Sequence, residues 1–283
     1  MQVFRTLIDA ATLGGLLGQP GLRIVDCRHD LGEPAAGRRA YSDAHLPGAV
    51  FMHLDEDLSG ACTGCNGRHP LPDRAAFAAR LGALGIGPED QVVAYDDAGG
   101  AIAARLWWML RWIGHERAAV LEGGLRAWRT ADLPLESAVP TLTAVTHHVR
   151  PPLVRTVEAP ELQEGIARNS LTLIDARSPD RFAGENETLD PVAGHIPGAL
   201  NRFFRNNLTD GRFRPAGELR AGFEALLAGR APVDVVHQCG SGVTACHNLL
   251  AMEVAGLHGA RLYPGSWSEW CADPARPVAT GDT

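Results

Sequence analysis

Short runs of apolar and β-branched residues recur along the chain, separated by segments with the apolar spacing of helices. The strand-like runs lie at 22–26, 91–95, 118–121, 171–175 and 233–237. Helical spacing is found between them, as in AAFAARLGALG at 75–85 and ELRAGFEALLAG at 218–229. Strands that are apolar throughout and alternate with helices are typical of parallel sheets covered by helices on both faces. The pattern therefore predicts an α/β protein with mostly parallel sheets flanked by helices.

The chain repeats itself once, in four pairs of similar segments that occur in the same order. The pairs are LRIVDCR at 22–28 and LTLIDAR at 171–177, AHLPGA at 44–49 and GHIPGA at 194–199, QVVAYD ending at Asp96 and DVVHQC ending at Cys239, and GGLRAW at 123–128 and GSWSEW at 265–270. Self-similarity of this kind indicates a duplicated structural unit. We therefore expect two copies of one domain.

A stretch that contains prolines separates the two copies. The sequence LPLESAVPTLTAVTHHVRPP at 133–152 lacks helical periodicity and has the composition of a linker. We expect an N-terminal domain over 1–138, a linker over 139–152 and a C-terminal domain over 153–283.

Composition and charge exclude several classes of protein. Of the 283 residues, 45% are hydrophobic and 21% are charged, as in an ordinary folded protein. The net charge is -7, and no basic run is present that would neutralise a phosphate backbone. No apolar stretch reaches the ~18 residues of a membrane span, and the N-terminus is a poor secretory signal. We expect a cytoplasmic protein with neither nucleic acid nor a membrane as its partner.

Cys239 stands out among the six cysteines, which are too irregularly spaced for a disulfide scaffold. It lies at the end of a strand-like run, before a loop with two glycines and then a helical segment. Glycines allow a tight turn that points N–H groups inward, and a helix N-terminus adds positive potential. Such a cradle favours a thiolate over an inert buried thiol and predicts a nucleophile. The loop residues expected to line the anion site are Gly240, Ser241, Gly242, Val243 and Thr244.

The first copy has Asp96 where the second has Cys239. A carboxylate in this position cannot attack as a thiolate and cannot carry a sulfur atom. We therefore expect the first copy to be catalytically silent.

These motifs together resemble the tandem-domain rhodanese-type sulfurtransferases. The resemblance rests on CGSGVTA at 239–245, the paired DCR and DAR strands, the HLPGA and HIPGA turns, the GGLRAW and GSWSEW segments, and Asp96 in place of a cysteine. It covers nearly the whole chain and implies two rhodanese-like domains. In the family, the cysteine takes sulfur from a donor as a persulfide and passes it to an acceptor. By resemblance, Cys239 carries that persulfide, and a thiol or cyanide accepts the sulfur, with thioredoxin as one candidate.

The resemblance also bears on the sulfur donor. The 3-mercaptopyruvate sulfurtransferases carry a similar CGSGVTA loop, whereas thiosulfate-preferring rhodaneses place basic residues directly after the cysteine. The former bind the carboxylate of the donor with arginines of the second domain, and Arg181 matches the first of these. The second has no match, because Asp190 and Pro191 stand where it is expected. Arg202 and Arg205 are candidates for the missing charge, and thiosulfate stays open as an alternative donor.

Further residues are assigned by the same resemblance. His45 resembles a pocket histidine that handles protons together with Ser241, although a histidine recurs in the second copy as His195, which also fits a repeated structural turn. Trp267 is expected to line the pocket beside Cys239 or to pack in the core.

No motif implies an organic cofactor or a metal ion. Cys62 and Cys65 form a CTGC segment that fits either two surface thiols or a redox pair. From a different class, a non-catalytic sulfur carrier or binding module remains an alternative to an enzyme.

Overall fold

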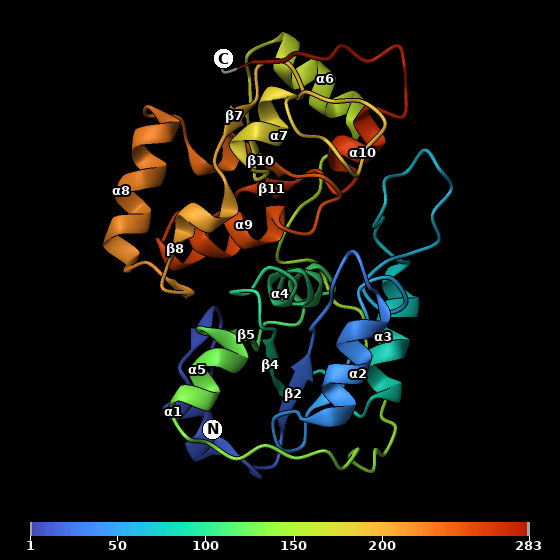
Figure 1. Cartoon of the computed structure of the whole chain (residues 1–283), viewed down its shortest axis with the longest axis vertical. Helices are drawn as coiled ribbons and strands as arrows, with labels where there is room; N and C mark the ends of the chain where they lie inside the picture. The colour runs from blue at the N-terminus through green and yellow to red at the C-terminus, as the bar shows by residue number, and fades with distance from the viewer. Residues whose placement is uncertain (1, 282–283) are drawn as a thin grey trace. The chain divides into compact units, whose positions relative to one another are not determined.

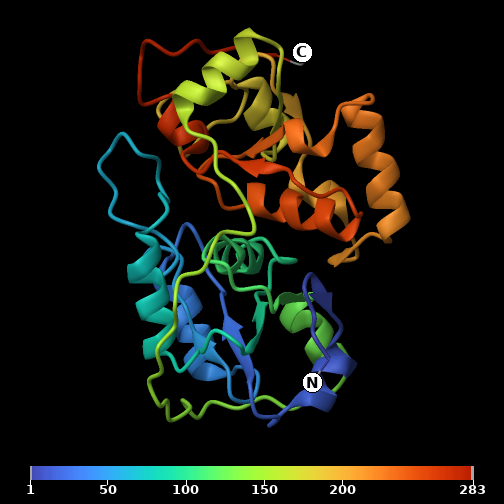
Figure 2. The same ribbon diagram turned by 180° about the vertical axis from the view of Figure 1, so that it is seen from behind.

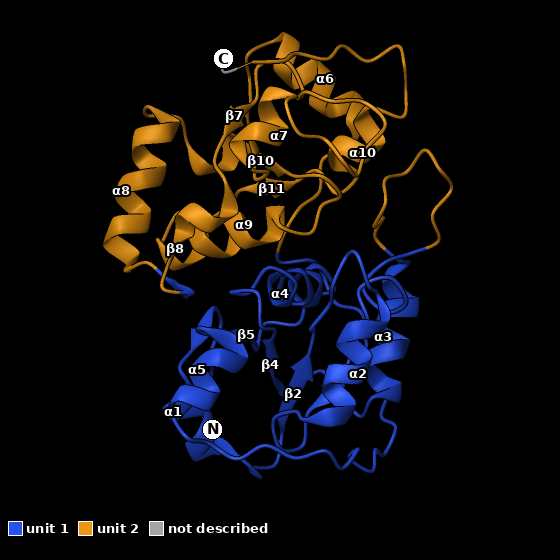
Figure 3. Cartoon of the chain, viewed as in Figure 1, with its two compact units in different colours: residues 1–60, 72–153, 211–213 blue, residues 61–71, 154–210, 214–283 orange. Residues whose placement is uncertain are grey.

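The computed structural model describes residues 2–281 and divides into two compact units (Figure 3). The first unit contains the chain up to residue 60, together with 72–153 and 211–213. The second contains 61–71, 154–210 and the chain from 214 on. The segment expected to be a linker, 139–152, lies within the first unit, where backbone hydrogen bonds join Val145 to Gly82 and Arg150 to Ile113. A part of the first sequence copy, 61–71, belongs to the second unit.

The first unit is a parallel sheet with helices on both faces. Its strands are β1 (Leu7–Ile8), β2 (Leu22–Asp26), β3 (Val50–Phe51), β4 (Gln91–Tyr95) and β5 (Ala118–Leu121), in the order β1-β5-β4-β2-β3. Its helices are α1 (Ala10–Leu16), α2 (Ala35–Asp43), α3 (Arg74–Ala83), α4 (Ala103–Trp112) and α5 (Gly124–Thr130). Figure 1 shows α1 and α5 on one side of this sheet and α2 and α3 on the other.

The second unit repeats this architecture around a sheet of order β11-β10-β6-β7, also parallel. Its strands are β6 (Thr172–Asp175), β7 (Leu200–Asn201), β10 (Val235–Gln238) and β11 (Arg261–Leu262). The short strands β8 (Leu208–Thr209) and β9 (Arg212–Phe213) form a separate two-stranded sheet, and β9 belongs to segment 211–213 of the first unit. Its helices are α6 (Ala159–Ala167), α7 (Pro179–Ala183), α8 (Ala216–Leu227), α9 (Ala245–Val254) and α10 (Ser266–Trp270), with 3-10 turns η1 (Phe204–Asn207) and η2 (Pro232–Asp234). Figure 2 gives the reverse view. The predicted α/β class with parallel, helix-flanked sheets is confirmed.

The repeated Asp-x-Arg motif forms the same buried ion pair in both units. Arg28 donates to Asp26 at 2.6 Å and to the carbonyl oxygen of Ala44 at 2.7 Å. Arg177 donates to Asp175 at 2.7 Å and to the carbonyl oxygen of Gly194 at 2.8 Å. In each unit the guanidinium ties a central strand end to the residue before the H-x-PG turn. A buried charge is tolerated because its partner is equally buried.

The two turn histidines also have matching surroundings. Nδ1 of His45 lies 2.7 Å from the Tyr41 carbonyl oxygen, and its ring stacks on that tyrosine. Nδ1 of His195 lies 2.8 Å from the Phe182 carbonyl oxygen, and its ring stacks on that phenylalanine. Both side chains are fully buried. The duplicated histidine therefore belongs to a duplicated structural turn.

Each sheet packs its apolar residues into a core of its own. Trp128 in the first core and Trp270 in the second come from the paired GGLRAW and GSWSEW segments. Each indole N–H donates to a carbonyl oxygen farther along the chain, of Pro134 and Pro277 respectively. Within residues 2–281, no helix combines the length and apolarity that crossing a membrane requires.

Acid should weaken the second unit through His237. Burial, with a smaller effect of Arg202, lowers the pKa of this β10 side chain from 6.5 to about 3. Between these pH values the unfolded chain binds a proton that the folded chain does not. We therefore expect the free energy of unfolding, measured by urea denaturation, to fall as pH drops below 6.5, with a contribution of at most about 1.4 kcal/mol per pH unit. His237→Leu should flatten this dependence.

The exposed His258 provides the control for this experiment. His258→Gln should leave the pH dependence of unfolding unchanged. An equal slope in wild type and His237→Leu would contradict the assignment.

Candidate active site

Cys239 directly follows β10 and is almost completely buried, with 2% of its surface exposed. Its N–H donates to Oγ of Ser266 at 3.1 Å, and its carbonyl oxygen accepts from the N–H of Trp267 at 3.0 Å. Ser266 adopts a left-handed backbone conformation with φ of 54° and also donates to the Tyr263 carbonyl oxygen. The start of α10 thus holds the cysteine backbone in place.

The two glycines after Cys239 have close neighbours, and the backbone neighbour of Gly242 leaves no room for a side chain there. Gly242 has φ of 76°, and a Cβ atom there would lie 2.4 Å from the Pro264 carbonyl oxygen. At Gly240, a Cβ atom would lie 2.9 Å from Nη2 of Arg68. No larger residue fits at Gly242 without moving the backbone. The loop then enters α9, with Thr244 at its N-cap and Val243 buried.

The first unit shows what this type of loop does with an anion. Four backbone N–H groups donate to the Asp96 carboxylate, from Ala98, Gly100, Ile102 and Ala103, at 2.8 to 2.9 Å. The carboxylate therefore occupies the anion cradle of its own unit. Since Asp96 and Cys239 are equivalent in the repeat, the same strand-loop-helix design surrounds Cys239, with a loop that is one residue shorter before its helix.

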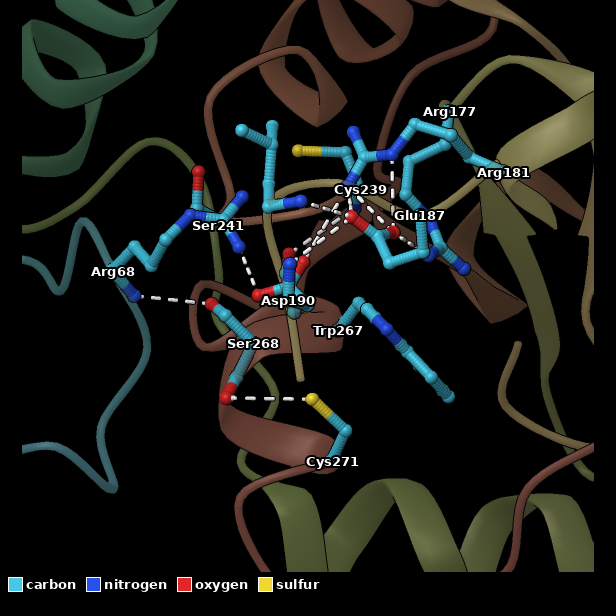
Figure 4. A network of polar contacts seen from close by, with 12 residues as sticks. Arg68, Arg177, Arg181, Glu187, Asp190, Cys239, Ser241, Trp267, Ser268 and Cys271 are labelled. Atoms are coloured by element: carbon cyan, nitrogen blue, oxygen red, sulfur yellow. Dashed lines mark hydrogen bonds and ion pairs between the residues drawn. The ribbon is translucent and has the colours of Figure 1, made fainter. Parts of the chain in front are cut away.

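Segment 61–71 brings two further side chains to the Cys239 loop. Nδ1 of His69 lies 2.7 Å from Oγ of Ser241. The N–H of Arg68 donates to Oγ of Ser268 at 3.0 Å (Figure 4). The histidine beside Ser241 is therefore His69, whereas the ring of His45 is bound within its own turn of the first unit. Sequence analysis missed this pairing, because the family resemblance pointed to the histidine of the HLPGA turn.

Ionised side chains form a network next to the cysteine (Figure 4). Arg181 donates to Glu187 at 2.8 Å and lies 3.4 Å from Asp190, and Arg68 forms an ion pair with Asp190. Burial works against the ionisation of Glu187, but hydrogen bonds from the Leu189 N–H and from Arg181 lower its pKa on balance. Burial raises the pKa of Asp190, and its bond with Arg68 opposes this effect.

Arg177 connects this network to the core of the unit. Its guanidinium lies 3.4 Å from Glu187 and 4.8 Å from the centre of the Trp267 ring. Burial disfavours its charge, but attraction to Asp175, Glu187 and Cys239 raises its pKa on balance. The cationic side chain is thus a permanent positive charge near the sulfur.

Three residues expected at the site have other contacts. Trp267 is fully buried in the core, and its indole N–H donates to the Val192 carbonyl oxygen. Arg202 stacks on Phe223 at 4.0 Å and donates to Asn207. Arg205 is exposed and lies over the rings of Phe203 and Phe204. The cations that the structure brings to the Cys239 loop are Arg68 and Arg181 instead.

The CTGC segment lies on the same stretch of chain as His69. Both thiols are exposed and unbonded to each other. Sγ of Cys62 approaches the Gly67 carbonyl oxygen at 3.4 Å, and Sγ of Cys65 lies 3.3 Å from Oγ1 of Thr63. That they act as a redox pair stays a prediction.

Comparison with known proteins identifies the family of both units. The model of the rhodanese-like domain matches twice, at residues 9–131 and 158–273. A probable 3-mercaptopyruvate sulfurtransferase of Pseudomonas aeruginosa is 48% identical over 279 residues, which cover 98% of each chain. A putative thiosulfate sulfurtransferase of Mycobacterium tuberculosis is 41% identical and is likewise covered to 98%.

Solved structures give the same result for the fold. The 3-mercaptopyruvate sulfurtransferase of Escherichia coli superimposes with a TM-score of 0.83 at 30% identity, covering 93% of this chain and 99% of the other. The enzyme of that name from Leishmania major gives a TM-score of 0.83 at 32% identity, covering 94% of this chain and 74% of the other.

Gly242→Ala should disrupt the cradle. A side chain in the left-handed region costs ~1 kcal/mol, and the clash with Pro264 adds to this. We expect the free energy of unfolding to fall by about 2 kcal/mol or more, and the alkylation rate of the Cys239 thiol by iodoacetamide to change at least about threefold.

Gly217 provides a matched control, because a Cβ atom there would meet nothing within 4 Å. Gly217→Ala should leave the reactivity of Cys239 unchanged and should not lower the free energy of unfolding, because alanine favours the helix α8 in which Gly217 lies. A Gly242→Ala protein with wild-type stability and thiol reactivity would show that the loop tolerates a side chain.

Proposed function

The chain belongs to the rhodanese family and is a sulfurtransferase, and on this premise we propose that its sulfur donor is 3-mercaptopyruvate. The sulfur passes through a persulfide on Cys239 to a thiol or to cyanide. The observation that carries this proposal is the hydrogen bond between Ser241 and His69 in the Cys239 loop. A small thiol or a protein thiol such as thioredoxin is the proposed acceptor, and the cytoplasm the proposed place of action.

The leaving group explains why this hydrogen bond favours mercaptopyruvate. When a thiolate attacks the sulfur of thiosulfate, sulfite leaves as a stable anion that needs no proton. When it attacks the sulfur of mercaptopyruvate, the carbon–sulfur bond breaks and its electron pair leaves on an enolate. Protonating that enolate requires a group that titrates near neutrality, which a histidine provides.

The proposed first step conserves protons as well as sulfur. The Cys239 thiolate forms a bond to the donor sulfur, and the donor carbon leaves with the electron pair as the enolate of pyruvate. The Ser241–His69 pair delivers one proton to the enolate and takes up the proton that the new persulfide loses when it ionises. In the second step an acceptor thiolate attacks the outer sulfur, which restores the Cys239 thiolate.

The anion cradle supports the persulfide. In the first unit, backbone N–H groups surround a fixed negative charge on Asp96. In the second unit the equivalent position holds Cys239, so the negative charge is the one that forms during turnover. Donors aimed at the place where charge develops stabilise an intermediate without reorganising. Arg177 adds a fixed cation to the same region.

Arg181 supports recognition of a keto-acid. Its Nη2 atom is only 3.5 Å from the place that a Cβ atom on Gly240 would occupy, so the guanidinium lies at the Cys239 loop. A planar guanidinium is suited to binding a carboxylate through two parallel hydrogen bonds. Glu187 holds the arginine in this position.

Cys239→Ser should abolish sulfur transfer, because a serine cannot form a persulfide. We expect transfer from mercaptopyruvate to fall at least about 10³-fold with unfolding unchanged. Peptide mass analysis of the wild type incubated with donor should locate the added sulfur on Cys239. The exposed thiol of Cys65 supplies the control, since Cys65→Ser should keep full activity. Substantial turnover by Cys239→Ser would point to a different nucleophile.

His69→Gln should separate the two donors. Loss of a general acid typically costs 10²- to 10⁴-fold, so we expect kcat with mercaptopyruvate to fall at least about 100-fold. Transfer from thiosulfate should change less than about tenfold, because sulfite needs no proton. Steady-state kinetics with both donors, and with the exposed His148 replaced by Gln as a control, measure the difference. Equal losses with both donors, or a wild type that prefers thiosulfate, would contradict the proposed donor.

A further inference from the structure

We propose that Arg68 binds the carboxylate of the donor together with Arg181. The inference rests on the function proposed above and identifies the second cation of its binding site. The resemblance places a second arginine before the HIPGA turn, where this chain has Asp190. Arg68 comes instead from segment 61–71, far away in the sequence but within the same compact unit.

The space around Gly240 locates both guanidinium groups. A Cβ atom on Gly240 would lie 2.9 Å from Nη2 of Arg68, 3.5 Å from Nη2 of Arg181 and 3.7 Å from Nη1 of Arg181. Gly240 directly follows the nucleophilic cysteine. The two arginines therefore converge on one point beside Gly240, the residue after the nucleophile, where both can meet one carboxylate.

The two terminal nitrogens of the Arg68 guanidinium have different neighbours. Nη1 forms the ion pair with Oδ1 of Asp190, while Nη2 is the atom closest to Gly240. Asp190 is itself buried, with 2% of its side chain exposed, and Arg68 is 30% exposed. The acidic residue thus anchors one end of a fork whose other end faces the Cys239 loop.

The backbone of Arg68 is held firmly on both sides. Before it, Gly67 has φ of 86°, and a Cβ atom there would lie 2.8 Å from the Gly265 carbonyl oxygen. Its own N–H donates to Ser268, and after it His69 contacts Ser241. A side chain on a fixed backbone loses little entropy when it binds a ligand.

The test compares two donors that differ only in the carboxylate. Mercaptoacetone has a methyl group where mercaptopyruvate has its carboxylate. For Arg68→Ala we expect kcat/KM with mercaptopyruvate to fall about 30-fold, mainly through KM, and kcat/KM with mercaptoacetone to change less than about threefold. Competitive inhibition by pyruvate, which carries the same carboxylate, should weaken about 30-fold. Arg68→Lys should restore part of the loss, because it keeps the charge but not the planar fork.

Gly240→Ala gives an independent test, because it displaces the Arg68 guanidinium instead of removing it. Its new methyl group would meet Nη2 of Arg68 and push the guanidinium aside, so it should also raise KM for mercaptopyruvate and the inhibition constant of pyruvate. Arg38 pairs with Glu56 on the surface and provides the control, since Arg38→Ala should change neither value.

The outcomes separate this inference from the proposed function. If Arg68→Ala lowers kcat/KM equally for both donors and leaves pyruvate inhibition unchanged, Arg68 only holds the loop and the inference is overturned. If the wild type itself transfers no sulfur from mercaptopyruvate but does so from thiosulfate, the proposed donor is wrong and the inference falls with it. The first result overturns the inference while the wild type still transfers sulfur from mercaptopyruvate. In the second result the wild type lacks that activity, so the two failures can be told apart.

Discussion

The buried ion pair of the Asp-x-Arg motif is the constraint on which each unit depends. In the second unit Asp175 fixes Arg177, which in turn reaches Glu187. Glu187 holds Arg181, and Asp190 joins that arginine to Arg68. Removing one charge from such a buried network leaves its partner uncompensated, at a cost of roughly 3–5 kcal/mol. The network that stabilises the fold is therefore continuous with the charges around the cysteine.

Duplication gave both units the same strand-loop-helix arrangement, in which the residue at the end of the strand now differs. Both units end a central strand in a loop whose backbone faces an anion, because parallel sheets gather such loops at one edge. In the first unit Asp96 fills its own cradle with four hydrogen bonds from backbone N–H groups. In the second unit the equivalent residue is Cys239, which brings no fixed carboxylate charge to the loop. The residue at the strand end and a loop one residue shorter thus distinguish the second unit from the first, whose carboxylate fills its own cradle.

The exchange of segment 61–71 is what completes the site. The sequence of this segment lies in the first copy, but its residues pack against the second unit. It supplies His69 next to Ser241 and Arg68 next to Gly240. The family resemblance pointed instead to His45, which recurs as His195 in an equivalent buried turn. The histidine and the arginine that contact the Cys239 loop come from a segment whose packing the sequence does not reveal.

By itself, the sequence determined the class of fold, the duplication and the place of Cys239 at the end of a strand, and it predicts that the copy with Asp96 is silent. These follow from local properties: apolar periodicity, motif spacing, and the glycines that a tight anion-binding turn requires. Only the tertiary structure decided which histidine meets Ser241 and that Arg68 lies beside Gly240. Such pairings depend on where a loop packs, and residues 172 positions apart, as His69 and Ser241 are, leave no periodic signal in the sequence. The sequence around an arginine or histidine on a loop does not show whether its side chain faces solvent or a cysteine. Its role is therefore set by packing alone.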